Sequence, residues 1–442
     1  MIKIKIIFFI LIFFLITRQS YADYVIDYYK WLLDNNQTQF LDKEKKPKLW
    51  SLDDYDRSKL GERFKWGFNP SLERLHYQVF HFNKQHDNWD KHVINGSSKP
   101  YKFKINLKAD RKKLIKIIDE DMQTTGLLSY LLFENDEIVI DKKSPDNRLG
   151  LLFNDRTKWT TASVGKSFTS YVVGQAICDG YIENIDVKLN DWPLIKNTLY
   201  EDAKLIDLLN MAAGDQKYSK SDLLNTKPKN PNLNSLKYHM EGHFKGSKPS
   251  NKKYNYGNII TNIIINYVWF KSNGDFQKIT DKVFKEKARI EDSIYFLKIS
   301  NQTSRGMKDG IRYKYQVNDE DGPLRYSMEL NRYDFLRVAK AMLDDWKNDT
   351  CVGKYLKTIH ERRISKQRKS YNSKIKTAFN HGRSYGGQFH FDFKGFKNRN
   401  IFALDGAYGQ SIIIDMDNSK IVSINAIHMN YNWHKIALGA LK

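Results

Sequence analysis

The sequence predicts an α+β fold in which strands from both ends of the chain share one sheet and a helical lobe is inserted between them. Short strand-like segments occur over residues 127–141 and again after residue 384, whereas apolar residues at helical spacing dominate the stretch between. The chain has 442 residues, 41% of them apolar, which is enough for a sizeable core. A ligand is expected in the cleft between the sheet and the helical lobe.

The first strands are predicted to form a hairpin. "LLSYLLFE" (127–134) and "EIVID" (137–141) are apolar segments joined at Asn135-Asp136, a dipeptide that favours a tight turn. A helix over residues 111–122 precedes this hairpin, because its leucine and isoleucines recur at helical spacing.

The middle of the chain is predicted to be largely helical. The expected helices cover residues 165–179, 205–211, 259–270 and 332–346. Strand-like sequence then returns in "GGQFHFDF", "NIFALDG" and "SIIIDMDNSKIVSINAI", the last of which is expected to fold back at Asp417-Asn418. Together with the hairpin these segments give roughly five strands, mostly antiparallel, and "NWHKIALGAL" is expected to close the chain with a short helix.

The N-terminus has the pattern of a secretory signal peptide. Two lysines precede an apolar run over residues 6–16, and the small residues Ser20 and Ala22 precede an expected cleavage point. Residues 1–22 therefore predict an exported protein located in the periplasm, with an uncleaved membrane anchor as the alternative. Residues 23–104 are aromatic-rich but weakly periodic, and are predicted to be an extension that packs on a main domain over residues 105–442.

The formal net charge of +22 raises the question of a nucleic-acid partner. The basic residues are scattered, and the strongest run, "HERRISKQRKS" over residues 360–370, lies in polar sequence without a nucleic-acid-binding motif. The sequence therefore favours a solvated basic face and no nucleic-acid partner, and leaves open an attraction to an anionic envelope surface. It carries no signal for the oligomeric state.

The cysteines and histidines do not indicate a cofactor, and neither a cofactor nor a metal is expected. Cys178 and Cys351 are far apart and lack metal-ligand spacing, so two buried free thiols are expected, although an oxidising compartment would permit a disulfide. His239 and His243 stand at i and i+4, but the sequence around them is typical of a loop and the His-Glu-x-x-His pattern is absent.

The segment "TTASVGKSFTS" (160–170) contains two overlapping motifs. Gly165-Lys166-Ser167 matches the end of a phosphate-binding loop, which also requires a glycine five positions before Gly165. Thr160 stands there instead, and a hairpin rather than a parallel strand precedes the segment, so nucleotide binding is not predicted. The other motif, Ser163-x-x-Lys166, is that of an acylating serine enzyme.

Ser163 and Lys166 can act together if they begin a helix. Residues at i and i+3 lie on one face, and the helix N-terminus offers backbone N–H groups to a developing oxyanion. A serine hydroxyl becomes a nucleophile only when a base takes its proton, and Lys166 is the candidate base. The alternative interpretation is a capping serine followed by a solvated lysine.

Tyr256-Gly257-Asn258 supplies a second polar element directly before an apolar helix. It could present a phenol and an amide to the same cleft as Lys166. A nearby ammonium would favour the phenolate form of Tyr256, so the lysine and the tyrosine could share proton transfer. A half-buried tyrosine and a capping asparagine at the helix start would account for these two residues equally well.

A series of segments, in order along the chain, resembles the serine β-lactamase and penicillin-binding-protein superfamily, in the branch of class C β-lactamases, related esterases and 6-aminohexanoate-dimer hydrolases. The segment "YSMELNRYDFLRVAKAML" is similar to the late helix of that branch. The other segments are "FENDEIVIDK", "WTTASVGKSFTSYVVGQAICDGYI", "LIDLLNMAAGD", "KGSKPSNKKYNYGN", "SYGGQFH" and "FALDGAYGQSIIIDMDNSKIV". The resemblance covers about residues 123–432 and implies a β-lactamase-like fold, with an antiparallel sheet flanked by helices, a helical lobe and a cleft between.

The resemblance also implies roles for individual residues. Ser163 would be the nucleophile, Lys166 its base, and Tyr256 a general acid/base that relays a proton to the leaving group. Asn258 would hydrogen-bond Lys166 and the substrate. The oxyanion hole would combine the N–H of Ser163 with that of Ala407, which follows Gly406 on the edge strand.

One departure from the family pattern bears on the substrate. β-Lactamases and penicillin-binding proteins carry Lys-Thr-Gly or a close variant on the strand beside the nucleophile, where this chain has Leu404-Asp405-Gly406. Without a cation to hold a substrate carboxylate, an exported serine hydrolase acting on a small-molecule ester or amide is favoured. The alternatives are a β-lactamase or D,D-peptidase, and a catalytically silent homologue that binds cell-wall fragments or a protein.

Overall fold

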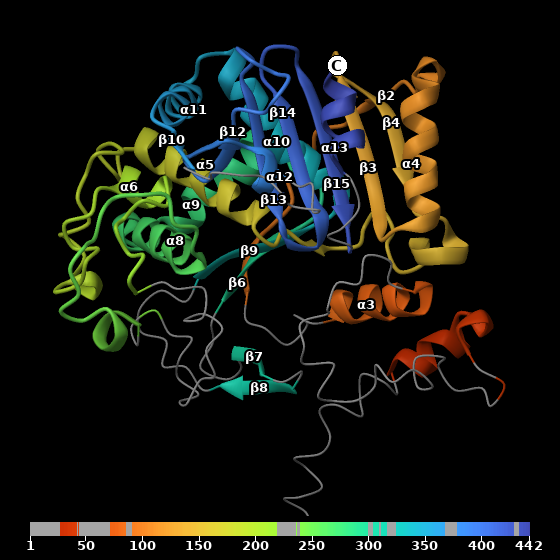
Figure 1. The fold of residues 1–442 in the computed structure, drawn as a ribbon, viewed down its shortest axis with the longest axis horizontal. Helices are drawn as coiled ribbons and strands as arrows, with labels where there is room; N and C mark the ends of the chain where they lie inside the picture. Colours follow the sequence, from red (N-terminus) through yellow and green to blue (C-terminus); the bar gives the residue numbers. More distant parts are fainter. Residues whose placement is uncertain are drawn as a thin grey trace, which may run out of the picture.

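The computed structural model describes residues 27–41, 43, 71–84, 91–218, 236, 239–298, 304–308, 311–315, 324–366, 378–427 and 433–442. Within these ranges the largest element is a nine-stranded sheet (Figure 1) with strand order β10-β11-β12-β13-β14-β15-β3-β4-β2. Its strands are β2 (Lys104–Ile105), β3 (Leu127–Glu134), β4 (Glu137–Lys143), β10 (Ile364–Ser365), β11 (Ser384–Gly386), β12 (Phe389–Phe391), β13 (Ile401–Gly406), β14 (Gln410–Asp415) and β15 (Lys420–Ala426).

The two ends of the chain meet in the middle of this sheet. The C-terminal strand β15 pairs antiparallel with β3, from Lys420 opposite Glu134 to Ala426 opposite Leu127. Figure 1 shows these strands side by side although they lie almost three hundred residues apart in the sequence. The predicted hairpin and C-terminal strands are confirmed, but the expectation of roughly five strands was too low. The short strands β2, β10 and β11 extend the sheet at its edges.

The sheet is covered on both faces, and alternate residues of its strands belong to different apolar clusters. In β13, Phe402 and Leu404 pack in the large core, whereas Ile401 and Ala403 pack in a second cluster on the opposite face. This is the period-2 pattern of a strand that is buried on both sides.

The helices divide between the two faces. The large core includes residues from α5, α8 and α10, whereas the second cluster is formed with α4 and α13. The helices are α3 (Leu72–Lys84), α4 (Lys112–Thr124), α5 (Val164–Cys178), α6 (Leu205–Leu209), α8 (Asn258–Ser272), α9 (Phe276–Asp281), α10 (Arg332–Lys347), α11 (Cys351–Glu361), α12 (Ala378–His381) and α13 (Trp433–Ile436). Shorter helical turns are η1 (Thr38–Phe40), η4 (Ala109–Arg111), η5 (Asp146–Gly150), η6 (Pro193–Ile195), η7 (His239–His243), η8 (Lys282–Lys287), η9 (Ala407–Gly409) and η10 (Leu438–Leu441).

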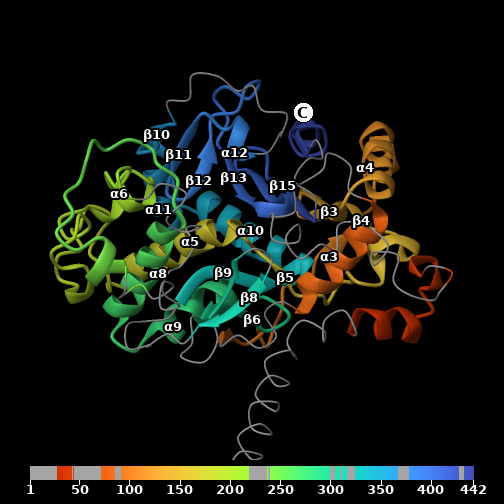
Figure 2. The same ribbon diagram turned by 60° about the horizontal axis from the view of Figure 1, so that its bottom comes forward.

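A second sheet takes two of its four strands, β6 and β9, from the stretch that was expected to be largely helical. It has the order β1-β6-β9-β5, with all neighbours antiparallel, and Figure 2 shows β9 running beside α5. Its strands are β1 (Lys91–Ile94), β5 (Trp159–Thr160), β6 (Ile294–Lys298) and β9 (Leu324–Leu330), and a separate hairpin is formed by β7 (Ser304–Lys308) and β8 (Ile311–Tyr315). Residues 326–330 are therefore strand, and only the rest of the segment that resembled a late helix, from Arg332 on, is helical.

The described part of the N-terminal extension packs on the rest of the protein. α3 and the helical residues 27–34 contribute Tyr28, Leu32 and Val79 to a cluster that also contains Phe153 and Trp159. Strand β1 pairs with β6. The segment is thus more regular than its sequence suggested, because α3 buries an amphipathic face that was not recognised. The predicted signal peptide lies outside the described residues, among which no helix has the length and hydropathy to span a membrane.

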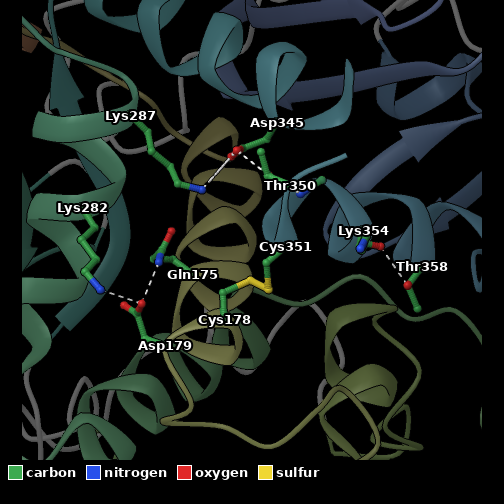
Figure 3. Close-up of a disulfide and its surroundings, with 11 residues drawn as sticks. Gln175, Cys178, Asp179, Lys282, Lys287, Asp345, Thr350, Cys351, Lys354 and Thr358 are labelled. Carbon is green, nitrogen blue, oxygen red and sulfur yellow. Dashed lines mark hydrogen bonds and ion pairs between the residues drawn. A yellow bond between two sulfur atoms is a disulfide. The ribbon is translucent and has the colours of Figure 1, made fainter. Parts of the chain in front are cut away.

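A disulfide joins Cys178, the last residue of α5, to Cys351, the first residue of α11 (Figure 3). Their Cα atoms lie 5.9 Å apart and their sequence positions are separated by 173 residues. The expectation of two buried free thiols was wrong, because the antiparallel packing of helices remote in sequence brings the two side chains together. The disulfide ties the C-terminal end of α5 to the helix that packs beside it.

Candidate active site

The backbone around Ser163 is held in an unusual conformation. Ala162, directly before it, has φ of +44°, in the left-handed region that alanine seldom adopts. Thr161, the residue before Ala162, is held to β9 by two hydrogen bonds with Met328. The Thr161 N–H donates to the Met328 carbonyl, and the Met328 N–H donates to the Thr161 hydroxyl. This turn places Ser163 at the N-cap of α5, where its side chain makes no capping hydrogen bond. The interpretation as a simple capping serine is therefore excluded.

Lys166 is buried although it carries an ionisable group. It is 1% exposed, and its Nζ donates to Oδ1 of Asn258 over 2.7 Å. Burial lowers its pKa well below the usual 10.5, and no carboxylate among the described residues contributes to that shift. Desolvation thus favours the neutral amine, which is the form in which a lysine can accept a proton. This excludes the alternative of a solvated lysine.

Tyr256 and Asn258 lie at the start of α8 and face the same lysine. Lys166 Nζ lies 5.1 Å from the centroid of the Tyr256 ring. Burial raises the pKa of Tyr256 well above 10, with a further rise from the neighbouring Tyr326, while a hydrogen bond with Ser163 lowers it. The expectation that a nearby ammonium would favour the phenolate was therefore wrong, since burial outweighs that effect and disfavours the ammonium as well. Tyr256 is present as a neutral phenol beside Ser163.

The end of strand β13 lies against the start of α5. A Cβ atom on Gly406 would stand 3.2 Å from the Ser163 nitrogen and 2.7 Å from the Thr161 carbonyl oxygen, so only glycine allows this approach. Ala407 follows on the exposed side of the strand end. The structure thus brings Gly406 to the backbone nitrogen of Ser163, beside the predicted oxyanion hole, and Ala407 is the next residue along the chain.

The residues that replace the Lys-Thr-Gly pattern are buried. Leu404 packs in the large core and Asp405 is 8% exposed. Asp405 lies close enough to Tyr256 to raise the pKa of that phenol further. The residues at the Lys-Thr-Gly position therefore supply a carboxyl group near Tyr256 and no cation.

Tyr326 on β9 was not recognised from the sequence. Its hydroxyl donates to Oδ1 of Asn258 over 2.9 Å, and its ring centroid lies 3.5 Å from Lys166 Nζ. Burial raises the pKa of Tyr326 to about 12, while a hydrogen bond with Ser163 lowers it. The sequence contains 26 tyrosines, and this one lies in a segment that was interpreted as helix, so no pattern marked it. The pairing of β9 with β5, which ends three residues before Ser163, would have placed Tyr326 near the site.

Near Ser163, a buried hydrogen-bond network joins three helices. The Ser167 hydroxyl donates to the Gln388 carbonyl over 2.6 Å, and the Gln388 side chain accepts from the Thr261 hydroxyl and donates to carbonyls at the end of α6. Gln388 has φ of +70° in the turn between β11 and β12. Ser167, which had no role in the Ser-x-x-Lys interpretation, thus fixes α5 to that turn.

The two histidines considered for metal binding lie in one short helical turn. His239 and His243 are the first and last residues of the turn η7, and the described residues contain no group of three or more histidine, cysteine, aspartate or glutamate side chains suited to a metal ion. His390 is buried, and its Nδ1 lies 2.8 Å from Lys366 Nζ.

Comparison with known proteins identifies the fold. Neither a family model nor a curated protein matches the sequence. A solved structure from Bacillus anthracis, provisionally named a 6-aminohexanoate-dimer hydrolase, is similar with a TM-score of 0.56 and 13% identity, over 86% of this chain and 96% of that chain. A structure from Bacteroides dorei DSM 17855, provisionally named a β-lactamase, has a TM-score of 0.53 and 14% identity, over 74% of this chain and 97% of that chain.

The chain therefore has the fold of the serine β-lactamase and penicillin-binding-protein superfamily. This confirms the predicted α+β, β-lactamase-like fold class.

Proposed function

We propose that this protein is a serine hydrolase that cleaves an ester or a small amide through an acyl-enzyme on Ser163. The observation that carries the proposal is the state of Lys166, a buried lysine three residues after the serine, without a carboxylate partner among the described residues and bonded to Asn258. Such a lysine serves as a base rather than as a solvated charge. The names of the two similar solved structures, a hydrolase and a β-lactamase, support the same class of chemistry.

The first step is acylation. The Lys166 amine takes the proton of the Ser163 hydroxyl while Oγ attacks the substrate carbonyl carbon. The oxygen of that carbonyl gains negative charge and is received by the N–H groups of Ser163 and Ala407, at the positive end of α5. The proton held by Lys166 passes through the Tyr256 phenol to the leaving alcohol or amine as the carbonyl–leaving group bond breaks.

The second step is hydrolysis of the acyl-enzyme. The lysine amine, free again, takes a proton from water, whose oxygen attacks the acyl carbonyl carbon. The proton returns to Ser163 Oγ as the acyl–serine bond breaks, and the carboxylic acid leaves. Asn258 keeps the lysine in place through both steps, because its Oδ1 accepts from Nζ over 2.7 Å.

The substrate is proposed to carry no carboxylate next to the scissile bond. Buried Leu404 and Asp405 offer no cation on β13, and Asp405 would repel an anionic group there. This favours simple esters and small amides over β-lactam antibiotics and D-Ala-D-Ala peptides, which present a carboxylate at that point.

We further propose that the protein is exported to the periplasm, as the sequence predicts, and that it contacts an anionic envelope surface. The disulfide between Cys178 and Cys351 supports an oxidising compartment. The net charge of +22 supports attraction to anionic headgroups.

Turnover assays test the hydrolase proposal. We expect the purified chain to hydrolyse p-nitrophenyl butyrate or a linear aminohexanoate amide, and the Ser163→Ala variant to lose that activity. Turnover of a cephalosporin without turnover of esters would support the β-lactamase alternative instead. Absence of turnover with all three substrates, in a folded protein, would support the catalytically silent homologue.

A further inference from the structure

Tyr326 occupies a position in the candidate active site that the Ser-x-x-Lys and Tyr-x-Asn motifs leave unassigned. It approaches Lys166 from the side of β9, whereas Tyr256 and Asn258 approach it from the start of α8. Its ring centroid lies 3.5 Å from Nζ, closer than the 5.1 Å of the Tyr256 ring. The catalytic lysine therefore lies directly over the face of a second tyrosine.

The fold fixes this contact through the backbone. Gly165 lies one residue before Lys166, and a Cβ atom at that position would stand 2.2 Å from the Tyr326 carbonyl oxygen. Only glycine lets β9 pack so closely on the first turn of α5. Two hydrogen bonds between Thr161 and Met328 hold the same strand two residues further on. Tyr326 is thus set by two backbone constraints, one on each side of Ser163 in the sequence.

We propose that Tyr326 is a positioning residue of the reaction, whose ring face stabilises the ammonium that Lys166 becomes when it takes the proton of Ser163 and whose hydroxyl fixes the Asn258 amide. The inference rests on the hydrolase proposal, which it deepens by naming how the buried positive charge is accommodated.

The need for such a group follows from the burial of Lys166. A buried amine binds a proton weakly, because desolvation penalises the charged form and the described residues provide no carboxylate near Nζ. An aromatic face attracts a cation without itself carrying charge, and it does so more strongly where water is excluded. The ring can thus stabilise the ammonium while leaving the lysine neutral before the reaction.

The hydroxyl of Tyr326 has a separate task. Asn258 Oδ1 accepts both from Lys166 Nζ, over 2.7 Å, and from the Tyr326 hydroxyl, over 2.9 Å. With two donors on one oxygen, the amide is held with Oδ1 toward the lysine. The ring and the hydroxyl therefore act on Lys166 by different routes and can be separated by substitution.

Other titratable groups in the described part of the chain lie around this lysine. Tyr256 faces it from the start of α8, and Tyr385 on β11 lies near enough to Tyr256 and Tyr326 for them to raise its pKa. Asp405 on β13 acts on Tyr256, and Arg325 on β9 acts on Tyr326 and lowers its pKa. A substitution of Tyr326 that keeps the shape of its ring leaves all of these in place.

The test measures the titration of Lys166 by NMR, with ¹³C at the lysine Cε and the signal assigned by its loss in Lys166→Ala. The key comparison is Tyr326→Phe against 3,4,5-trifluorophenylalanine introduced at the same position. Both rings have nearly the same shape, but fluorine removes most of the negative charge from the ring face. The matched control is Tyr101→Phe against trifluorophenylalanine at position 101, where Lys340 Nζ lies 4.5 Å from the ring centroid.

We expect the titration midpoint of Lys166 to fall by about one pH unit from Phe to trifluorophenylalanine at position 326, and not at all in the pair at position 101. Fluorophosphonate labelling of Ser163 should slow in the same order. Equal midpoints in the two position-326 proteins would overturn the proposal, as would a higher midpoint with the fluorinated ring.

Failure of the hydrolase proposal is a separate result. A wild-type chain that is never labelled at Ser163 would refute the hydrolase proposal. The NMR titration needs no turnover, so the titration midpoints of Lys166 would still decide whether the ring of Tyr326 stabilises the ammonium.

Discussion

Removal of the disulfide should lower the stability of the fold by a calculable amount. The bond closes a loop of 173 residues, and a loop of this length costs the unfolded chain about 17 cal/mol/K of entropy, or about 5 kcal/mol at 25 °C. For a chain of 442 residues the unfolding entropy is about 0.9 kcal/mol/K, so Cys178→Ala/Cys351→Ala should lower Tm by about 6 °C. Alanine is chosen because it adds no polar group to the partly buried end of α5.

Scanning calorimetry of the oxidised wild type and the double variant measures this difference. A reductant should lower the Tm of the wild type toward that of the variant and leave the variant unchanged. Two reactive thiols in the wild type, unfolded without reductant, would refute the disulfide. Equal Tm values for the two oxidised proteins would refute the account of its stabilising effect.

Four further predictions concern the site and the core. Gly165→Ala should destabilise the fold by about 1–3 kcal/mol in chemical denaturation, because the new methyl group meets the Tyr326 carbonyl; wild-type stability would contradict the packing of β9 on α5. Asn258→Ala should slow fluorophosphonate labelling about tenfold or more, because Lys166 loses its acceptor; an unchanged rate would remove Asn258 from the site. The labelling rate should level off at a pH below 10.5, since burial lowers the pKa of Lys166 well below that usual value; a rate that still rises tenfold per pH unit up to pH 10 would show an ordinary lysine. The free energy of unfolding should fall by up to about 1.4 kcal/mol per pH unit as the pH drops from 6.5 toward 3, because burial lowers the pKa of His76 to about 3 and the unfolded chain binds the proton more tightly. The His76→Phe variant should show a smaller dependence on pH, and an equal dependence would contradict the assignment to His76.

The parts of the fold that the sequence predicted are those with strong local patterns. Helix α5, the hairpin β3–β4 and strands β13 to β15 each carry a long apolar run or a clear turn dipeptide, and each lies where it was expected. Two short motifs singled out the candidate site residues Ser163, Lys166, Tyr256 and Asn258. These motifs occur along the chain in the same order as in the family that the sequence resembles.

The features that were missed depend on contacts between distant segments. Strands β2 and β10 have two residues each, too few to show alternation, and pair only because their neighbours hold them at the sheet edge. The partnership of Cys178 with Cys351 needs the packing of α5 on α11. Tyr326 needs the pairing of β9 with β5, which is set by residues on both sides of the helical lobe.

Several predictions from the sequence stay predictions. They are the boundary between extension and main domain after residue 104, the signal peptide over residues 1–22 with the export it implies, the predicted partners, and the catalytic roles of the site residues.

The most direct test of the central claim is mass spectrometry of the chain after treatment with a fluorophosphonate, followed by peptide mapping. The account predicts a single phosphonyl adduct, formed with loss of fluoride and located on Ser163, in the wild type and not in Ser163→Ala. Lys166→Ala, which keeps the serine but removes its base, should label far more slowly. A folded wild-type chain without an adduct on Ser163, or with the adduct on another residue, would contradict the claim that Ser163 is the nucleophile.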